Sequence, residues 1–177
     1  MQRTVSCVTR EVLGGRAYQP GDQPFVMAFM RNEGGRVREY PAPLGRHPTL
    51  LLSLRHQYRF IHLPGDTEHG PWSVTTVAYS YELLDRSEHR LIAYHWHPDP
   101  RSDETFPSFP HLHVGHQFAH SALPEDFRPH ASALVRAHPP TGRVSLESIL
   151  RLAIQELGVE PLVERWESVL EETKAGG

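Results

Sequence analysis

The distribution of proline is the feature that most limits how this chain can fold. Of its 16 prolines, all but Pro161 lie within the first 140 residues, most of them between apolar runs. A proline inside a helix removes a backbone hydrogen bond and clashes with the preceding turn, so long helices are not expected there. The pattern therefore predicts short extended segments joined by turns over about residues 1–140.

The clearest strand pattern covers residues 49–63. Apolar or aromatic side chains alternate there with polar ones, and alternating side chains point to opposite faces of a strand. The same reasoning predicts strands at 3–8, 72–84, 91–97 and 111–114 and a hairpin turn at 85–89, and it leaves the run 25–31 open between strand and helix.

The last 33 residues change from the period of a strand to that of a helix. Ser145 is a good N-cap, apolar residues then recur at helical spacing, and Gly158 ends the segment. Pro161 fits the first turn of a second amphipathic helix, so a helical hairpin is expected over about residues 145–173. Residues 115–140, which precede the hairpin, are expected to be irregular. The apolar stripes that should pack on the sheet comprise Leu146, Ile149, Leu150, Ile154, Leu157, Trp166 and Leu170.

The chain is expected to form one domain, residues 1–177, of the α+β class. Its length suffices for a single core but is short for two domains. The helical stripes must be buried, and the apolar faces of the strands are the available partner. We therefore expect a mostly antiparallel sheet, formed by about residues 1–140, with the C-terminal helical hairpin packed on one face.

Composition excludes several classes of protein. With 38% apolar and 22% charged residues the chain should fold, and it lacks the ~18–20 consecutive apolar residues of a membrane span. Its first residues contain no apolar secretory run, so a cytoplasmic protein is expected. The net charge of −3 provides no general attraction for polyanions, so any nucleic-acid contact must be local. The single cysteine, Cys7, is expected to be a buried small hydrophobe.

Histidine is concentrated in one part of the chain. Nine of the 13 histidines lie in residues 89–138, and four of them form two His-x-His pairs, His95/His97 and His111/His113. Residues i and i+2 of a strand point the same way, and opposed side chains of neighbouring strands lie within about 5 Å. Four imidazoles could therefore converge on one point.

Such a cluster suits two chemistries. Zn²⁺ or another divalent metal takes neutral imidazoles, and three protein ligands leave a position for water. His116 could complete an H-x-H-x-x-H ligand set with His111 and His113. Without a metal, histidines near a pKa of about 6.5 can act as general acid and base in phosphodiester cleavage. The structural alternative is that these histidines form the solvated face of a sheet.

Several other polar and aromatic residues have both a possible functional role and an ordinary structural one. Arg55 and Arg59 share the polar face of the 49–63 strand and could bind substrate phosphates, although an ordinary solvated face fits equally well. His56 interrupts the apolar face and is expected to be a core histidine satisfied by a hydrogen bond. Tyr79 and Tyr81 are expected to lie in the core. No role is expected for His47, His69, His89, His120 and His130.

Three segments in the second half of the chain share their order with a known family. These are the tyrosine-rich VAYSYELLD, the His-x-His segments AYHWHPD and PHLHVG, and the capped helix GRVSLESILRLAIQEL. In this order they resemble the TumE-like toxins of bacterial toxin–antitoxin systems, over about half of the chain, although two His-x-His pairs stand here where one is expected. The resemblance implies an RNA-directed toxin held by an antitoxin-like protein partner, and it assigns a role only to His111 and His113.

The sequence thus predicts a hydrolase that acts on phosphodiesters through its histidine face, with or without a metal. A non-enzymatic metal-binding or partner-binding module that uses the same histidines is the alternative. A phosphate-binding P-loop, a dinucleotide glycine fingerprint, a nucleophile elbow and an HExxH helix are all missing from the chain. These reaction classes are therefore disfavoured.

Overall fold

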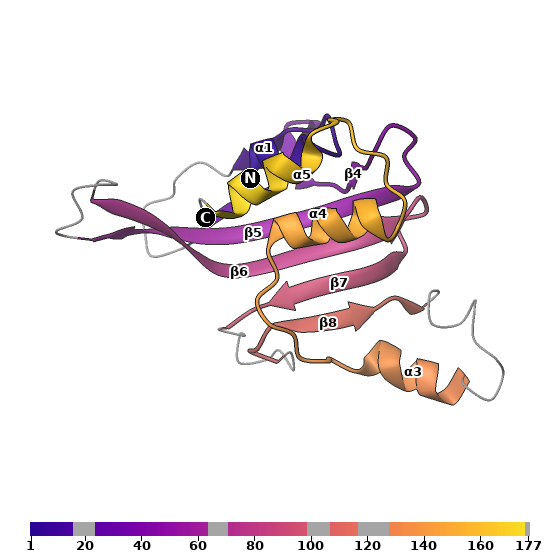
Figure 1. Cartoon of the computed structure of the whole chain (residues 1–177). Coiled ribbons are helices and arrows are strands. Elements are labelled where there is room, and N and C mark those ends of the chain that lie inside the picture. Colours follow the sequence, from indigo (N-terminus) through magenta and orange to yellow (C-terminus); the bar gives the residue numbers. More distant parts are fainter. Residues whose placement is uncertain (16–23, 64–70, 99–106, 117–127, 176–177) are drawn as a thin grey trace.

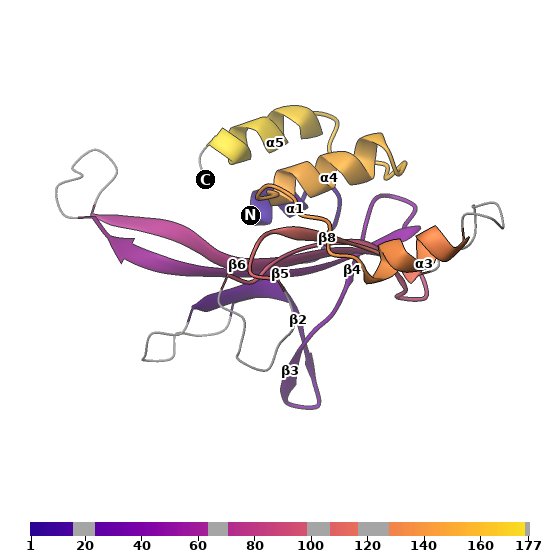
Figure 2. The same ribbon diagram turned by 90° about the horizontal axis from the view of Figure 1, so that it is seen from below.

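A computed structural model of the protein describes residues 1–15, 24–63, 71–98, 107–116 and 128–175. Within these residues, eight strands form an antiparallel sheet in the order β1-β2-β5-β6-β7-β8, with β3 paired to β2 and β4 paired to β5. Helices α1, α4 and α5 all lie on one side of this sheet (Figure 1, Figure 2). The predicted α+β fold, with a C-terminal helical pair packed on one face, is confirmed.

Two long strands form the centre of the sheet. β5 (Leu50–His62) and β6 (Trp72–Asp85) pair along their whole length and confirm the two strands expected in this part of the chain. β7 (Arg90–Trp96) and β8 (His111–Val114) extend the sheet beyond β6. On the other side lie β1 (Leu13–Gly15), β2 (Phe25–Glu33), β3 (Arg36–Glu39) and β4 (Ala42–Pro43).

One face of the sheet is apolar because alternate residues of neighbouring strands stand opposite each other. Leu54 of β5 pairs with Tyr81 of β6, which in turn pairs with Tyr94 of β7. Trp96 lies on the same face and is 7% exposed. These residues share one hydrophobic cluster with the helices, so the sheet and the helical layer are built around a common core.

The C-terminal helices cover this apolar face. α4 (Leu146–Gln155) begins at the expected N-cap, where the Ser145 hydroxyl oxygen accepts a hydrogen bond from the Ser148 N–H, and it buries Leu150 completely against the sheet. α5 (Trp166–Ala175) packs on α4 and on α1 (Gln2–Val5), farther from the strands (Figure 2). None of the helices among these residues is long and apolar enough to cross a bilayer.

Details of the helical pair differ from the expectation. α5 begins at Trp166 and not near Pro161. The segment before it is held to the N-terminal region, where the Leu162 N–H donates to the Cys7 carbonyl. Leu157 is 37% exposed, because α4 ends at Gln155 and Leu157 lies in the turn that follows. Cys7 is buried, as expected.

Two segments adopt a helix where none was predicted. Residues 3–8 were expected to form a strand, but α1 occupies part of them; Val5 and Val8 are both buried, and so short a run fits either period. Residues 115–140 were expected to be irregular, but they contain α3 (Arg128–Arg136), in which Pro129 occupies the tolerated first turn. The open run 25–31 belongs to β2. His69 and His120 lie outside the described residues.

Candidate metal centre

The pairing of β7 with β8 brings three histidines to one face of the sheet. His95 stands directly opposite His111, and His113 stands opposite Ala93 on the same face. The intervening Tyr94 and Leu112 point to the helical side because side chains alternate. Three of the four predicted histidines are therefore placed together, on the face that α4 does not cover.

A glycine permits β8 to end close to β7. The Gly115 N–H donates to the Leu91 carbonyl at 2.8 Å, and a Cβ atom at this position would lie 1.6 Å from the Arg90 carbonyl oxygen. Any side chain here would push the strands apart, and with them the histidines. This explains in physical terms why glycine follows the histidine pair in the PHLHVG segment.

The three imidazoles are close enough to share one ion. One ring nitrogen from each of His95, His111 and His113 lies within 4.8 Å of the others. The Nε2 atoms of His111 and His113 are 3.1 Å apart. Two nitrogens bound to one Zn²⁺ at about 2.1 Å in tetrahedral geometry would be separated by about 3.4 Å, so small ring rotations would complete the geometry.

Two of these rings are oriented by partners that can only accept a hydrogen bond. His95 donates from Nε2 to the Glu82 carboxylate at 3.3 Å, and His111 donates from Nδ1 to the Phe109 carbonyl at 2.9 Å. A neutral imidazole has one N–H, so Nδ1 of His95 and Nε2 of His111 keep their lone pairs. Metal-binding histidines typically have this second partner, which orients the ring and fixes its tautomer.

Glu82 is itself held in place as an anion. Its carboxylate also accepts hydrogen bonds from Arg90 Nε at 2.9 Å and from the Ser80 hydroxyl at 3.2 Å. Burial raises its pKa, but the hydrogen bonds from His95 and Arg90 and the charge of Arg90 outweigh this effect and lower the pKa to about 2. Glu82 therefore stays ionised at neutral pH, which suits a carboxylate that supports a histidine ligand.

Burial keeps the inner histidines neutral. His111 is fully buried and His113 is 9% exposed. Burial lowers the pKa of His113 to about 4, with a smaller contribution from the neighbouring histidines, and it also lowers the pKa of His111. Because the His111 proton is already on Nδ1, the His113 Nε2–H must donate to His111 Nε2 in the absence of an ion. A cation at this point would replace that shared proton.

The burial of His111 depends on a segment that follows α3. The Leu112 N–H donates to the Pro139 carbonyl at 2.9 Å, and the Thr141 N–H donates to the Pro110 carbonyl at 2.8 Å. These bonds place residues 139–141 along the outer side of β8, and α3 lies beside the same strand (Figure 1). The outer edge of the sheet is thereby covered next to the histidines.

Sequence reasoning missed two residues of this site. Glu82 was read only as part of a strand, and its role follows from the register that sets Ser80 opposite His95. His138 belongs to the segment that was expected to be irregular; its ring centre lies 4.7 Å from that of His113 and 5.3 Å from that of His111. The concentration of histidine in residues 89–138 was the one signal that included His138.

The other predicted ligands lie outside the close group. His97 follows the end of β7, and its ring centre is 5.7 Å from that of His95. His116 is exposed beyond Gly115. Among the described residues, only His95, His111 and His113 have ligand atoms close enough together to form a metal-binding group.

The two predicted phosphate-binding arginines are separated by the structure. Arg55, Ser80, His95 and His111 stand in one row across four strands and share the histidine face. Arg55 forms an ion pair with Glu39, and both side chains are about one third exposed. Arg59 lies four residues farther along β5, about 13 Å from this row, so the site does not include it.

On the helical face of the sheet, His56, Tyr79 and Tyr81 have the structural roles that were expected of them. His56 Nδ1 bonds to the Tyr81 hydroxyl at 2.7 Å, and its Nε2 lies 3.2 Å from the Thr76 hydroxyl. Tyr79 and Tyr81 are almost fully buried. A core histidine satisfied by hydrogen bonds and two core tyrosines were both expected, and both expectations are confirmed.

Comparison with known proteins adds no further constraint to this site. No protein-family model, no curated protein and no solved structure matches the chain. The resemblance to TumE-like toxins therefore stays a prediction.

Proposed function

We propose that the protein binds one divalent metal ion, with Zn²⁺ as the best match, through His95, His111 and His113. The supporting observation is the three-imidazole group itself, whose ligand atoms lie within 4.8 Å of one another. Neutral imidazole nitrogen is a preferred ligand of Zn²⁺, and two of the rings already have the hydrogen-bond partners that metal ligands require.

The same geometry favours a metal over direct acid and base catalysis by the histidines. A general acid must reach the substrate, whereas His111 is completely buried. It must also carry a proton at the working pH, whereas the pKa of His113 is lowered to about 4. Burial and neutrality are unfavourable for acid catalysis, but both are suitable for a metal ligand.

We further propose that the metal site hydrolyses phosphodiesters, with RNA as the first substrate to test. Three protein ligands leave a position for water, and a bound metal lowers the pKa of that water toward 7. Hydrolysis adds one water across a P–O bond and yields a phosphomonoester and an alcohol. Arg55 lies two strands from His95 on the same face, about 10 Å away, and could bind a neighbouring phosphate by exchanging its partly exposed partner Glu39.

A non-enzymatic metal-binding role is the second candidate, and His138 favours it. Its ring lies next to both His111 and His113. If His138 supplied a fourth imidazole, the site would be closed to water, as structural zinc sites are. The metal would then fasten the segment after α3 to β8.

The test measures metal content and nuclease activity in parallel. Wild type and His113→Ala are purified, loaded with Zn²⁺, dialysed and assayed by elemental analysis and by cleavage of single-stranded RNA and DNA. His47→Ala is the matched control, because the His47 side chain is 90% exposed. We expect one metal per chain and RNA cleavage in wild type and in the control, and neither in His113→Ala.

The outcomes separate the two candidates. Stoichiometric metal without cleavage would contradict the hydrolase and favour the structural role. Wild-type protein that is folded by circular dichroism and holds no metal after loading would refute the metal centre altogether.

A further inference from the structure

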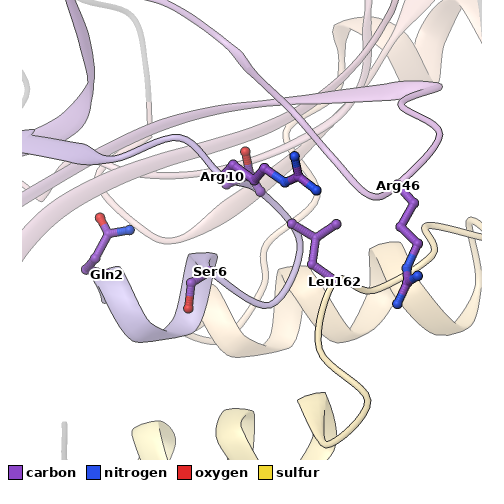
Figure 3. A pocket seen from close by; sticks show the side chains of 6 residues that line it. Gln2, Ser6, Arg10, Arg46 and Leu162 are labelled. Carbon is purple, nitrogen blue, oxygen red and sulfur yellow. The ribbon is translucent and has the colours of Figure 1, made fainter.

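A second site lies far from the histidines, on the helical side of the sheet. A cavity of about 570 Å³, open to solvent on one side, is lined by side chains from the N-terminal region, from the loop after β4 and from the segment before α5 (Figure 3). This volume is typical of a small-molecule pocket. The lining residues are Gln2, Ser6, Thr9, Arg10, Arg46 and Leu162.

Backbone hydrogen bonds hold the walls of this cavity together. The Gly45 N–H donates to the Val8 carbonyl at 2.6 Å, and the Leu162 N–H donates to the Cys7 carbonyl at 2.7 Å. Gly45 has a φ of +80°, and a Cβ atom there would lie 2.9 Å from the Glu160 carbonyl oxygen, so glycine is required for this close approach. The three segments are thus fixed to one another by the fold.

The cavity is positively charged in a chain whose net charge is −3. Arg10 and Arg46 both line it, and none of the six lining residues carries a carboxylate. Within the described part of the chain, Arg10 has no ion pair. Arg46 Nε is 3.3 Å from Glu160 and 3.4 Å from the Pro161 carbonyl oxygen, but both side chains of the ion pair are 53% exposed, so that pair contributes little, and both contacts use only Nε. Two guanidinium groups are therefore available to a ligand.

The other lining residues, Thr9 and Leu162, indicate which further groups a ligand should have. The Thr9 oxygen accepts a hydrogen bond from the Glu11 N–H, which leaves the hydroxyl proton free to donate. Leu162 provides an apolar surface and appears between the two arginines in Figure 3. Guanidinium forks match the planar carboxylate and the phosphate group.

We propose that this cavity binds a small molecule in which an oxyanion, carboxylate or phosphate, is joined to an apolar group. The oxyanion bonds to the side chains of Arg10 and Arg46, and the apolar group packs on Leu162. The site is independent of the histidine centre, which lies on the opposite face of the sheet.

In the test, the full chain is titrated in a calorimeter with inorganic phosphate, phenyl phosphate and benzoate in separate experiments. We expect phenyl phosphate or benzoate to bind more tightly than inorganic phosphate, and the tighter of the two identifies the anion. Arg10→Gln and Arg46→Gln should each weaken binding by ~10-fold or more, because each removes charge-assisted hydrogen bonds. Arg38→Gln, in the exposed strand β3, is the matched control and should change nothing.

Two results would overturn the proposal. One is the absence of saturable binding for all three probes up to about 10 mM, which is weaker than any specific pocket of this size should be. The other is binding that survives both Arg10→Gln and Arg46→Gln, since it would then take place elsewhere, for example at the histidine centre. The arginines are exposed, so circular dichroism should show that both variants remain folded.

Discussion

Each face of the sheet holds a histidine that is at least partly buried, and the comparison of the two shows what distinguishes a structural histidine from a ligand. Burial lowers the pKa of His56, on the helical face, and of His113, on the open face, to about 4 in both cases. His56 meets the hydroxyl groups of Tyr81 and Thr76, which can donate or accept as a neutral imidazole requires. His113 meets another imidazole, that of His111. The pKa is the same, but the partners differ.

The hydrogen-bond partners of a histidine, and not its pKa, therefore indicate whether it is a structural residue or a metal ligand. A lowered pKa reports only that the charged form is poorly solvated. Two adjacent imidazole nitrogens share a single proton, and a metal ion in its place could bind both nitrogens. An imidazole between two hydroxyl groups, in contrast, has a hydrogen bond at each of its nitrogens. The comparison therefore predicts that the two histidines respond differently to substitution, to metal and to pH.

The largest expected effect is on metal binding by His113→Ala. Four-ligand zinc sites bind with about 10–16 kcal/mol, so one ligand accounts for about 2.5–4 kcal/mol, a loss of ~10²–10³ in affinity. His56→Ala should leave zinc affinity unchanged, because its ring lies on the other face of the sheet. Competition with a chelator of known affinity measures both values. Equal zinc affinities for the two variants would contradict the assignment of His113 as a ligand and of His56 as a structural residue.

The next largest effect concerns the packing of the helical face. Leu150 is completely buried, and Leu150→Ala should lower the free energy of unfolding by about 3 kcal/mol, because it removes apolar contact and leaves a cavity. Leu157→Ala, at a position 37% exposed on the same segment, should change it by about 0.5 kcal/mol or less. Urea titration provides the comparison. If Leu150→Ala left the free energy of unfolding unchanged, α4 would not be packed on this face of the sheet.

The helical face could be predicted well from the sequence, whereas the open face could be predicted only in part. Alternation within residues 49–63 and the periodicity after Ser145 depend on local order, and both were confirmed. The position of Glu82 beside His95 depends on how β6 and β7 are aligned, and the register shift between Leu83 and Leu84 cannot be seen in either strand alone. Local patterns do not contain that information.

The same reason accounts for His138. Its approach to His111 depends on residues 139–141 pairing with β8, which are separated from that strand by α3. Proline had predicted irregular chain there, and a proline in the first turn of a helix gives the same signal as a proline in a loop. His95, His111 and His113 were within reach of sequence reasoning because the i and i+2 spacing applies inside each strand.

A smaller effect is expected from Glu82→Gln. This change keeps the size of the side chain but removes the charge that orients His95, and outer partners of this kind typically contribute 10–100-fold to metal affinity. Glu39→Gln is the matched control, because Glu39 pairs with Arg55 on β5, two strands away from His95. Chelator competition again gives the result. If the two variants bound zinc equally well, Glu82 would have no part in the centre.

The smallest expected effect is on how the free energy of unfolding depends on pH. The pKa of His56 is about 4 in the folded protein, against about 6.5 in the unfolded chain, so only the unfolded state gains a proton on this residue between these values. Its contribution to stability is therefore present above pH 6.5 and is lost as the pH falls toward 4, by about 1–2 kcal/mol between pH 7 and pH 5. His56→Gln cannot titrate and should lose that much less stability over the same interval in urea titrations of metal-free protein. His113 should still contribute its own acid sensitivity in this variant, whereas in zinc-loaded protein acid should release the metal first. If His56→Gln and wild type lost stability in parallel, burial would not be what keeps His56 neutral in the folded protein.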